Sequence, residues 1–136
     1  MKQLRMFVLL VSFVSVSLLL QGCAAVLVGG VIAGTAYGTV KYSRNTLSVT
    51  EQVTLNKAWA SANATVKALG YRATASGKDS STARLDAKTA KDQPVRIDLT
   101  FKSETSTEIE ITVGTFESPD NRAKEDQIYN QMKSRF

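Results

Sequence analysis

Residues 95–113, VRIDLTFKSETSTEIEITV, decide the fold of this chain. On both sides of the short polar stretch at 103–106, apolar residues alternate with polar or charged ones. A period of two is typical of a strand that is buried on one face only. Because short Ser and Thr side chains can bond to the local backbone in a turn, the stretch predicts an antiparallel hairpin. Its predicted buried face consists of Val95, Ile97, Leu99, Phe101, Ile109, Ile111 and Val113.

The opposite face of this hairpin is predicted to be polar and exposed to solvent. Arg96, Asp98 and Lys102 on its first strand could form ion pairs with Glu108 and Glu110 on its second. Pairs of opposite charge on neighbouring strands stabilise a sheet slightly.

Three more strands are predicted before the hairpin. The alternation in residues 71–76 and again in 83–88, on either side of Gly77-Lys78-Asp79, predicts a further hairpin. An alternation that begins at Thr46 predicts the first strand of the sheet. The residues predicted to face inward are Leu47, Val49, Val53, Tyr71, Ala73, Ala75, Ala83, Leu85 and Ala87.

A helix is predicted over residues 55–69, where apolar residues recur every three or four positions. Thr54 is its predicted N-cap, and Gly70 is its C-terminal stop. We interpret Trp59, the largest apolar residue of the helix, as its anchor in the core rather than as a platform for a ligand. The apolar stripe consists of Leu55, Trp59, Ala62, Val66 and Leu69.

A second helix is predicted to begin after Ser118, its N-cap. Pro119 occupies the first helical position, where its missing N–H costs nothing, and Asp120 lies near the positive end of the helix dipole. The apolar stripe of this helix consists of Ile128, Met132 and Phe136.

The first 22 residues have the pattern of a secretory signal peptide: Lys2 and Arg5 precede an apolar run over residues 6–20. The sequence Leu-Gln-Gly-Cys at 20–23 then resembles the bacterial lipobox, in which the Cys is acylated with fatty acids such as palmitate and the chain is cut before it. We therefore predict that residues 1–22 are removed and that Cys23 is lipidated. The chain has one cysteine, so Cys23 cannot form an internal disulfide.

The segment that follows Cys23 is apolar and rich in glycine. Residues 24–40 carry no charge, and Gly30, Gly34 and Gly38 are spaced four apart, so a helix would place them on one face. Such a helix would be about 25 Å long, slightly shorter than the hydrocarbon core of a bilayer. The segment is interpreted either as an inserted helix that self-associates through these glycines into a homo-oligomer, or as a flexible apolar tether at the membrane surface.

Together these patterns predict an α+β fold: an antiparallel sheet of four to five strands with two helices on one face. The predicted organisation is a cleaved signal peptide at 1–22, a lipidated, Gly-rich, membrane-proximal segment at 23–42, and a globular domain at 43–136. A domain of this size can bury a core without disulfides or metal.

The charge balance is mildly basic. The chain has 17 Lys and Arg against 12 Asp and Glu, and removal of Lys2 and Arg5 leaves a net charge of +3. No run of like charges appears, so the surface is interpreted as mixed and solvated. An exported protein meets no genomic nucleic acid, and the predicted partners are therefore membrane lipid, an envelope protein or a cell-wall polymer.

The residue types argue against enzymatic chemistry. There is no His, which removes the usual base near neutral pH and the commonest transition-metal ligand. Glu108 and Glu110 would lie about 7 Å apart on one strand face, a spacing that could flank a glycosidic bond, but charged residues on an exposed strand face need no such role. Asp79, Asp86 and Asp92 lack the alternate spacing of a calcium loop. We predict no cofactor, no metal and no catalytic residue.

Several short motifs resemble a family of small bacterial lipoproteins that is classed only as a domain of unknown function. They are the lipobox Cys23, the Gly-rich AVLVGGVIAGTAYG that follows it, the segment from Leu55 to Trp59, Ala-Leu-Gly at 68–70, and Val-Gly-Thr-Phe at 113–116. The resemblance implies an exported, anchored α+β domain and brings no active site.

The function predicted from the sequence is that of a membrane-anchored envelope lipoprotein acting as a non-enzymatic structural or interaction module. The alternative is a periplasmic module that binds a lipid or another hydrophobic ligand between sheet and helices, where small residues such as Ala73, Ala75, Ala83 and Ala87 could leave room. Ala24 after Cys23, in place of Asp, resembles the pattern of lipoproteins passed on to the outer membrane. The predicted location is therefore the periplasmic side of an outer membrane, with a single Gram-positive membrane as the alternative.

Overall fold

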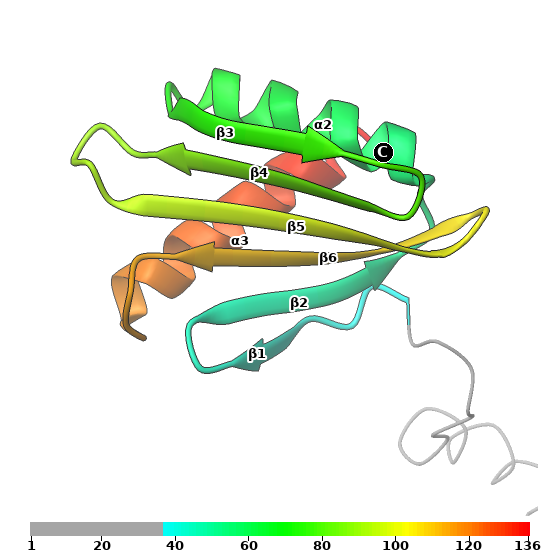
Figure 1. Cartoon of the computed structure of the whole chain (residues 1–136). Helices are drawn as coiled ribbons and strands as arrows, with labels where there is room; N and C mark the ends of the chain where they lie inside the picture. Colours follow the sequence, from blue (N-terminus) through cyan, green and yellow to red (C-terminus); the bar gives the residue numbers. More distant parts are fainter. Residues whose placement is uncertain (1–36) are drawn as a thin grey trace, which may run out of the picture. The chain divides into compact units, whose positions relative to one another are not determined.

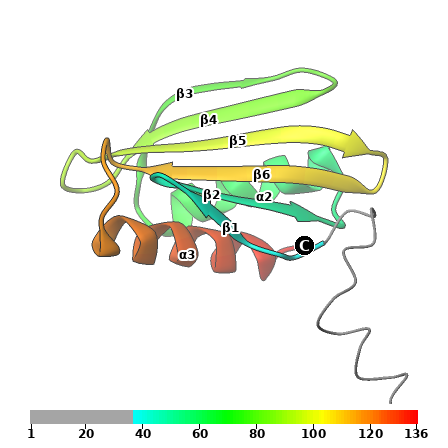
Figure 2. The same cartoon turned by 90° about the horizontal axis from the view of Figure 1, so that it is seen from below.

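A computed structural model describes residues 37–136 of the chain. In this part, six strands form one antiparallel sheet in the order β1-β2-β6-β5-β4-β3, and two helices cover one of its faces (Figures 1 and 2). The predicted α+β class, the antiparallel pairing and the two helices on one face are confirmed. The elements are β1 Lys41–Ser43, β2 Thr46–Glu51, α2 Leu55–Ala68, β3 Arg72–Lys78, β4 Thr82–Lys88, β5 Pro94–Ser103, β6 Ser106–Val113 and α3 Pro119–Lys133.

The predicted number of strands, four to five, is wrong, because residues 37–136 contain six. The additional strand is β1, which pairs antiparallel with β2 through a tight turn at Arg44 and Asn45. Arg44 has a left-handed backbone, with φ of +55°. Three residues are too few to show a strand period, so β1 exists only because the neighbouring β2 offers it an edge to pair with.

The central hairpin of the sheet is the predicted one, but the prediction that Phe101 belongs to its buried face is wrong: Phe101 is 42% exposed, where the pairing with β6 shifts register. β5 and β6 pair so that Ile97 lies opposite Ile111 and Leu99 opposite Ile109. All four side chains are buried under the helices. The turn begins after Ser103, where the Ser103 and Ser106 hydroxyls lie 2.7 Å apart, within hydrogen-bond distance.

Local sequence signals mark where both helices begin and where α2 ends. The Thr54 hydroxyl accepts a hydrogen bond from the Lys57 N–H at 3.2 Å, and the Ser118 hydroxyl accepts one from the Asn121 N–H at 3.2 Å. Gly70 follows α2 with φ of +69°, the left-handed conformation that favours glycine after a helix. The predicted caps are therefore confirmed.

The interpretation of Trp59 as the core anchor of α2 is wrong. Trp59 packs against the core at its margin and is only partly buried, whereas Ala58 beside it is fully buried. The Ser61 hydroxyl donates to the Met132 carbonyl of α3 at 2.8 Å, which brings the two helices close together. Close helix packing needs small residues, so Ala58, Ser61 and Ala62 take the central positions and Trp59 is left at the flank.

The predicted inward face of β3 is also wrong at Ala75. A bulge between Ala73 and Ala75 shifts the pairing with β4, so Ala73 lies opposite the buried Ala87 but Ala75 lies opposite Asp86, on the other face. After the bulge, Ser76 and Lys78 are opposite Leu85 and Ala83 and take the helix-facing positions. All seven residues of β3 are exposed, because the strand offers the helices almost no apolar surface to cover.

Candidate interaction face

The face of the sheet that the helices leave open presents a broad array of polar side chains. In Figure 1 this face is turned toward the viewer, with α2 and α3 behind it. It forms because every second residue of the central strands is polar, and these residues are partly or fully exposed. Its charged members are Arg84, Asp86 and Lys88 of β4, Arg96, Asp98 and Lys102 of β5, and Glu108 and Glu110 of β6.

Ion pairs cross this face from strand to strand. Arg84 lies directly opposite Asp98 and contacts it at 2.5 Å, and Arg96 lies opposite Asp86 and contacts it at 2.7 Å. The hydrogen bond from Arg84 to Asp98 raises the pKa of the Arg84 guanidinium. The two pairs run in opposite directions between the same strands, so their four charges cancel, and Lys88 adds one positive charge to the paired length of β4 and β5.

The predicted pairing between β5 and β6 is found for one pair. Lys102 contacts Glu108 at 2.6 Å, as the sequence suggested. Asp98, by contrast, lies directly opposite Glu110, so two carboxylates face each other across the two strands. Arg84 holds Asp98, while Glu110 is exposed beside Ser48 of β2. Arg96, Asp98 and Glu110 therefore form the charged centre of the open face.

Shallow depressions adjoin this centre. One, of about 610 Å³, is lined by Arg84, Asp98 and Glu110 together with the β3–β4 turn. Another, of about 560 Å³, lies toward the β1–β2 turn and is lined by Arg96, Asp98 and Glu110 as well as Ser48 and Thr112. Both depressions share Asp98 and Glu110. The arrangement offers hydrogen-bond donors and acceptors of both charges to a partner, and it has no enclosed pocket for a small substrate.

The two candidate catalytic carboxylates, Glu108 and Glu110, have different surroundings. Glu108 is held by Lys102, and Glu110 is exposed to solvent. Glu108 is partly exposed, so neither side chain lies in a site that excludes water.

The three aspartates considered for calcium lie in separate interactions. The Asp79 carboxylate accepts the Ser81 and Thr82 N–H groups, each at 2.7 Å, in the β3–β4 turn, and these bonds lower its pKa to about 2. Asp86 contacts Arg96, and Asp92 contacts Arg72 at 2.9 Å. Within residues 37–136, no three His, Cys, Asp or Glu side chains lie close enough together to hold a metal ion.

The predicted lipidation site Cys23 and the glycines Gly30 and Gly34 lie outside the described residues. Gly38 is described: it has φ of +71°, and its N–H donates to the Thr50 carbonyl at 2.8 Å. Neither described helix has the length and hydropathy needed to span a bilayer. The membrane role of the Gly-rich segment therefore remains a prediction.

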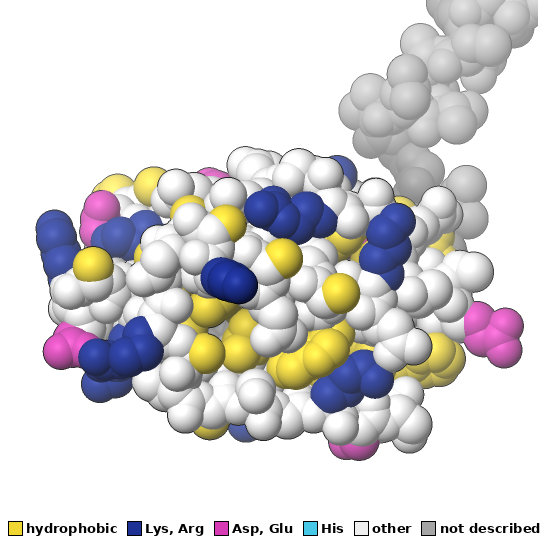
Figure 3. Space-filling model, turned by 90° about the horizontal axis from the view of Figure 1, so that it is seen from above, with side chains coloured by type: hydrophobic (Ala, Val, Ile, Leu, Met, Phe, Trp, Pro, Cys, Tyr) yellow, Lys and Arg dark blue, Asp and Glu magenta, His cyan; other side chains and the backbone are white. Residues whose placement is uncertain are grey.

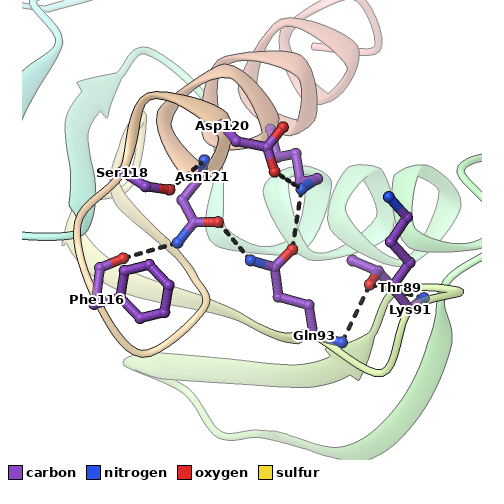
Figure 4. A network of polar contacts seen from close by, with 8 residues as sticks. Thr89, Lys91, Gln93, Phe116, Ser118, Asp120 and Asn121 are labelled. Carbon is purple, nitrogen blue, oxygen red and sulfur yellow. Dashed lines mark hydrogen bonds and ion pairs between the residues drawn. The ribbon is translucent and has the colours of Figure 1, made fainter.

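Sequence reasoning missed a polar network at one end of the sheet (Figure 4). The buried Asn121 side-chain amide donates to the Phe116 backbone carbonyl at 2.8 Å and accepts from the Gln93 side-chain amide, and Lys124 donates to Gln93 Oε1 at 3.1 Å. The network ties the loop after β4, the loop after β6 and the first turn of α3 together. The signal that could have revealed it is Gly114, in the Val-Gly-Thr-Phe motif, which has φ of +76°.

Two buried carboxyl groups were also missed. Glu51 ends β2 on the helix-facing side, where it accepts a hydrogen bond from the Tyr129 hydroxyl and contacts Lys133 at 3.0 Å. Glu125 of α3 is fully buried; one carboxyl oxygen accepts the Val113 N–H at 3.2 Å, and the other has no partner. Burial raises the pKa of Glu125. Both look like surface charges in the sequence, because nothing near them in the chain marks them as buried.

A protein-family model matches most of the chain. The model of the family described as "Protein of unknown function (DUF3568)" matches residues 5–131, a range that runs from the N-terminal apolar stretch through Cys23 to α3. No curated protein matches the chain.

Proposed function

We propose that this chain, which belongs to the DUF3568 family, is a lipid-anchored protein of the bacterial cell envelope whose folded domain is a non-enzymatic interaction module. The anchor in this proposal is the acylated Cys23, after removal of residues 1–22. The partner is another envelope protein or a cell-wall polymer.

The open sheet face is the observation that carries the proposal. Its charges are arranged in cross-strand pairs around Arg96, Asp98 and Glu110, with shallow depressions on either side. A broad, polar, exposed face supports recognition of a large partner better than conversion of a small substrate, since catalysis needs groups held in a water-excluded site. The absence of His from the sequence supports the same reading.

Site-specific photo-crosslinking in intact cells tests the interaction role. A photoreactive residue at Thr112, on the open face, should capture a defined partner, whereas the same residue at Asn130, on the exposed side of α3, should not. Asp98→Arg should weaken capture from position 112 because it reverses the charge at the centre of the face. Equal capture from both positions would contradict the proposal.

The anchor has its own test. The N-terminal peptide of the native protein should begin at Cys23 and carry the mass of its acyl chains, and the protein should be found in the outer-membrane fraction of a host that has one. A native product that begins at Met1, or an unmodified Cys23, would contradict the anchoring.

A further inference from the structure

A second exposed surface lies along β3, the edge strand of the sheet, and the neighbouring helix α2 (Figure 3). We call it the α2–β3 edge, and it is separate from the open face. α3 packs on β2 and β6 and α2 packs mainly on β4 and β5, so neither helix covers the helix-facing side of β3. Ser61 of α2 faces α3, and a residue two positions away on an α-helix points about 160° from it. Trp59 therefore lies on the flank of α2 that faces β3.

This flank is apolar. Leu69 and Tyr71, which follow α2, are also only partly buried, and Ala73 of β3 is exposed. Phe101 continues the helix-facing side of β5; it is 42% exposed, and its N–H donates to Ser81 next to the β3–β4 turn at 2.7 Å. Figure 3 shows hydrophobic side chains gathered in a hollow of this face, with Lys and Arg side chains around them.

Most of the charges of this edge are positive. Residues 52–78, which include all of α2 and β3, contain Lys57, Lys67, Arg72 and Lys78 and no Asp or Glu. Asp79 follows β3, but its carboxylate is turned into its own turn by the Ser81 and Thr82 N–H groups. Asp92 offsets part of the charge, since it contacts Arg72 at 2.9 Å and Lys88 at 4.0 Å. The rest of the edge is positively charged.

We propose that the α2–β3 edge, with Trp59 at its centre and Lys67 and Lys78 on either side, docks the domain on an anionic phospholipid bilayer. Trp and Tyr rings are favoured at the boundary between lipid and water, and basic side chains beside them are attracted to anionic head groups. An added protein strand fits less well, because the bulge in β3 and its flanking cations are features that oppose edge-to-edge strand pairing.

The inference goes beyond the proposed function and does not rest on acylation of Cys23. It concerns which side of the folded domain meets the membrane, and the open sheet face stays free to bind a partner. Failure of the lipid-anchor test would leave it standing, and failure of the test below would leave the interaction role standing.

The test uses the full chain in vesicles, with Trp59 as the reporter because it is the chain's one tryptophan. Brominated lipids quench tryptophan that they contact. We expect stronger quenching, and emission at shorter wavelength, in vesicles that contain brominated phosphatidylglycerol than in vesicles of brominated phosphatidylcholine alone. The difference should shrink as salt is added, since salt screens exposed charges.

Charge reversal supplies the matched comparison. The variant K67E/K78E should lower the ratio of docked to undocked domain about 30-fold or more, since each basic residue near an anionic surface contributes about fivefold. The variant R44E, in the turn after β1 at the opposite edge of the sheet, makes the same change in charge as K67E alone and should be quenched like the wild type. Both variants should keep the melting temperature of the wild type, which shows that the domain is folded.

Three outcomes would overturn the inference. Equal quenching in the two lipids would show that charge has no role. If K67E/K78E is quenched as strongly as the wild type, the lipid contact lies elsewhere on the domain. If soluble polyglutamate shifts the Trp59 emission while anionic vesicles do not, the edge binds an acidic polypeptide rather than lipid.

Discussion

Asn121 leaves no room for a side chain at position 114. A Cβ added to Gly114 would lie 2.5 Å from Asn121 Nδ2, closer than such atoms approach in folded proteins, and 3.0 Å from Gln93 Nε2. Gly114 also has a left-handed backbone, which residues with a side chain rarely adopt. The glycine of the Val-Gly-Thr-Phe motif is therefore needed for two reasons, its backbone conformation and the contact with Asn121.

Gly114→Ala should destabilise the domain by about 3 kcal/mol or more, since the left-handed backbone and the displaced buried amide both contribute. Urea denaturation measures the change. Gly70→Ala is the matched control: Gly70 has a similar φ of +69°, but nothing lies within 4 Å of an added Cβ, so only about 1 kcal/mol should be lost. Equal losses would mean that the contact with Asn121 has no energetic weight.

The buried Glu125 should make stability depend on pH. Burial raises its pKa from the ordinary value of 4.5, with smaller effects from the nearby charges of Arg122, Asp126 and Glu117. A raised pKa in the folded state gives stability that is present below 4.5 and is lost as the pH rises through the folded value. Relative to the wild type, Glu125→Gln should therefore gain stability as the pH rises above 4.5.

Thermal unfolding across this pH range measures the difference between the two proteins. Asp79→Asn is a control of opposite sign at lower pH: the pKa of Asp79 is lowered from 3.8 to about 2, so the wild type should lose its advantage over this variant as the pH falls through that interval. Parallel profiles for Glu125→Gln and the wild type would show that Glu125 does not titrate differently in the folded domain.

Tyr129 should contribute to stability through its hydroxyl. Tyr129→Phe removes a donor to the buried Glu51 carboxylate and should cost about 1–3 kcal/mol in urea denaturation. Tyr42→Phe removes a hydroxyl that also donates to a carboxylate, that of Asp126, but Tyr42 is 41% exposed. Water can replace that bond, so the expected loss is below about 0.5 kcal/mol. A greater loss of stability for Tyr42→Phe than for Tyr129→Phe would contradict the conclusion that the buried hydrogen bond to Glu51 is the stronger of the two.

The alanines of β3 and β4 distinguish a packed core from a ligand site. Ala87 is 2% exposed beneath the helices, so Ala87→Leu should overpack the core and cost about 1–3 kcal/mol. Ala75 lies on the other side of the bulge and is exposed, so Ala75→Leu should change stability by less than about 0.5 kcal/mol. If Ala87→Leu is tolerated, there is room between sheet and helices, and the alternative of a bound hydrophobic ligand gains support.

Much of the fold follows from the sequence. The alternation in 95–113 predicts the central hairpin and its buried side, and Thr54 and Ser118 mark where the helices begin. Of the open face, the sequence predicts which charges are exposed and one of the ion pairs, Lys102 with Glu108. The bulge in β3 was not predictable, because Ala73 and Ala75 fit an ordinary alternation equally well.

The sequence alone determined the elements whose signals lie between near neighbours: strand alternation, helix spacing and caps depend on side chains within a few positions of one another. Tertiary structure decided what depends on residues that are distant in the chain. It placed β2 beside β6, brought Glu51 to Tyr129, put Asn121 against Gly114, and left Trp59 at the edge of the sheet rather than in the core. These outcomes depend on which surfaces meet when the helices pack on the sheet, and no local pattern encodes that contact.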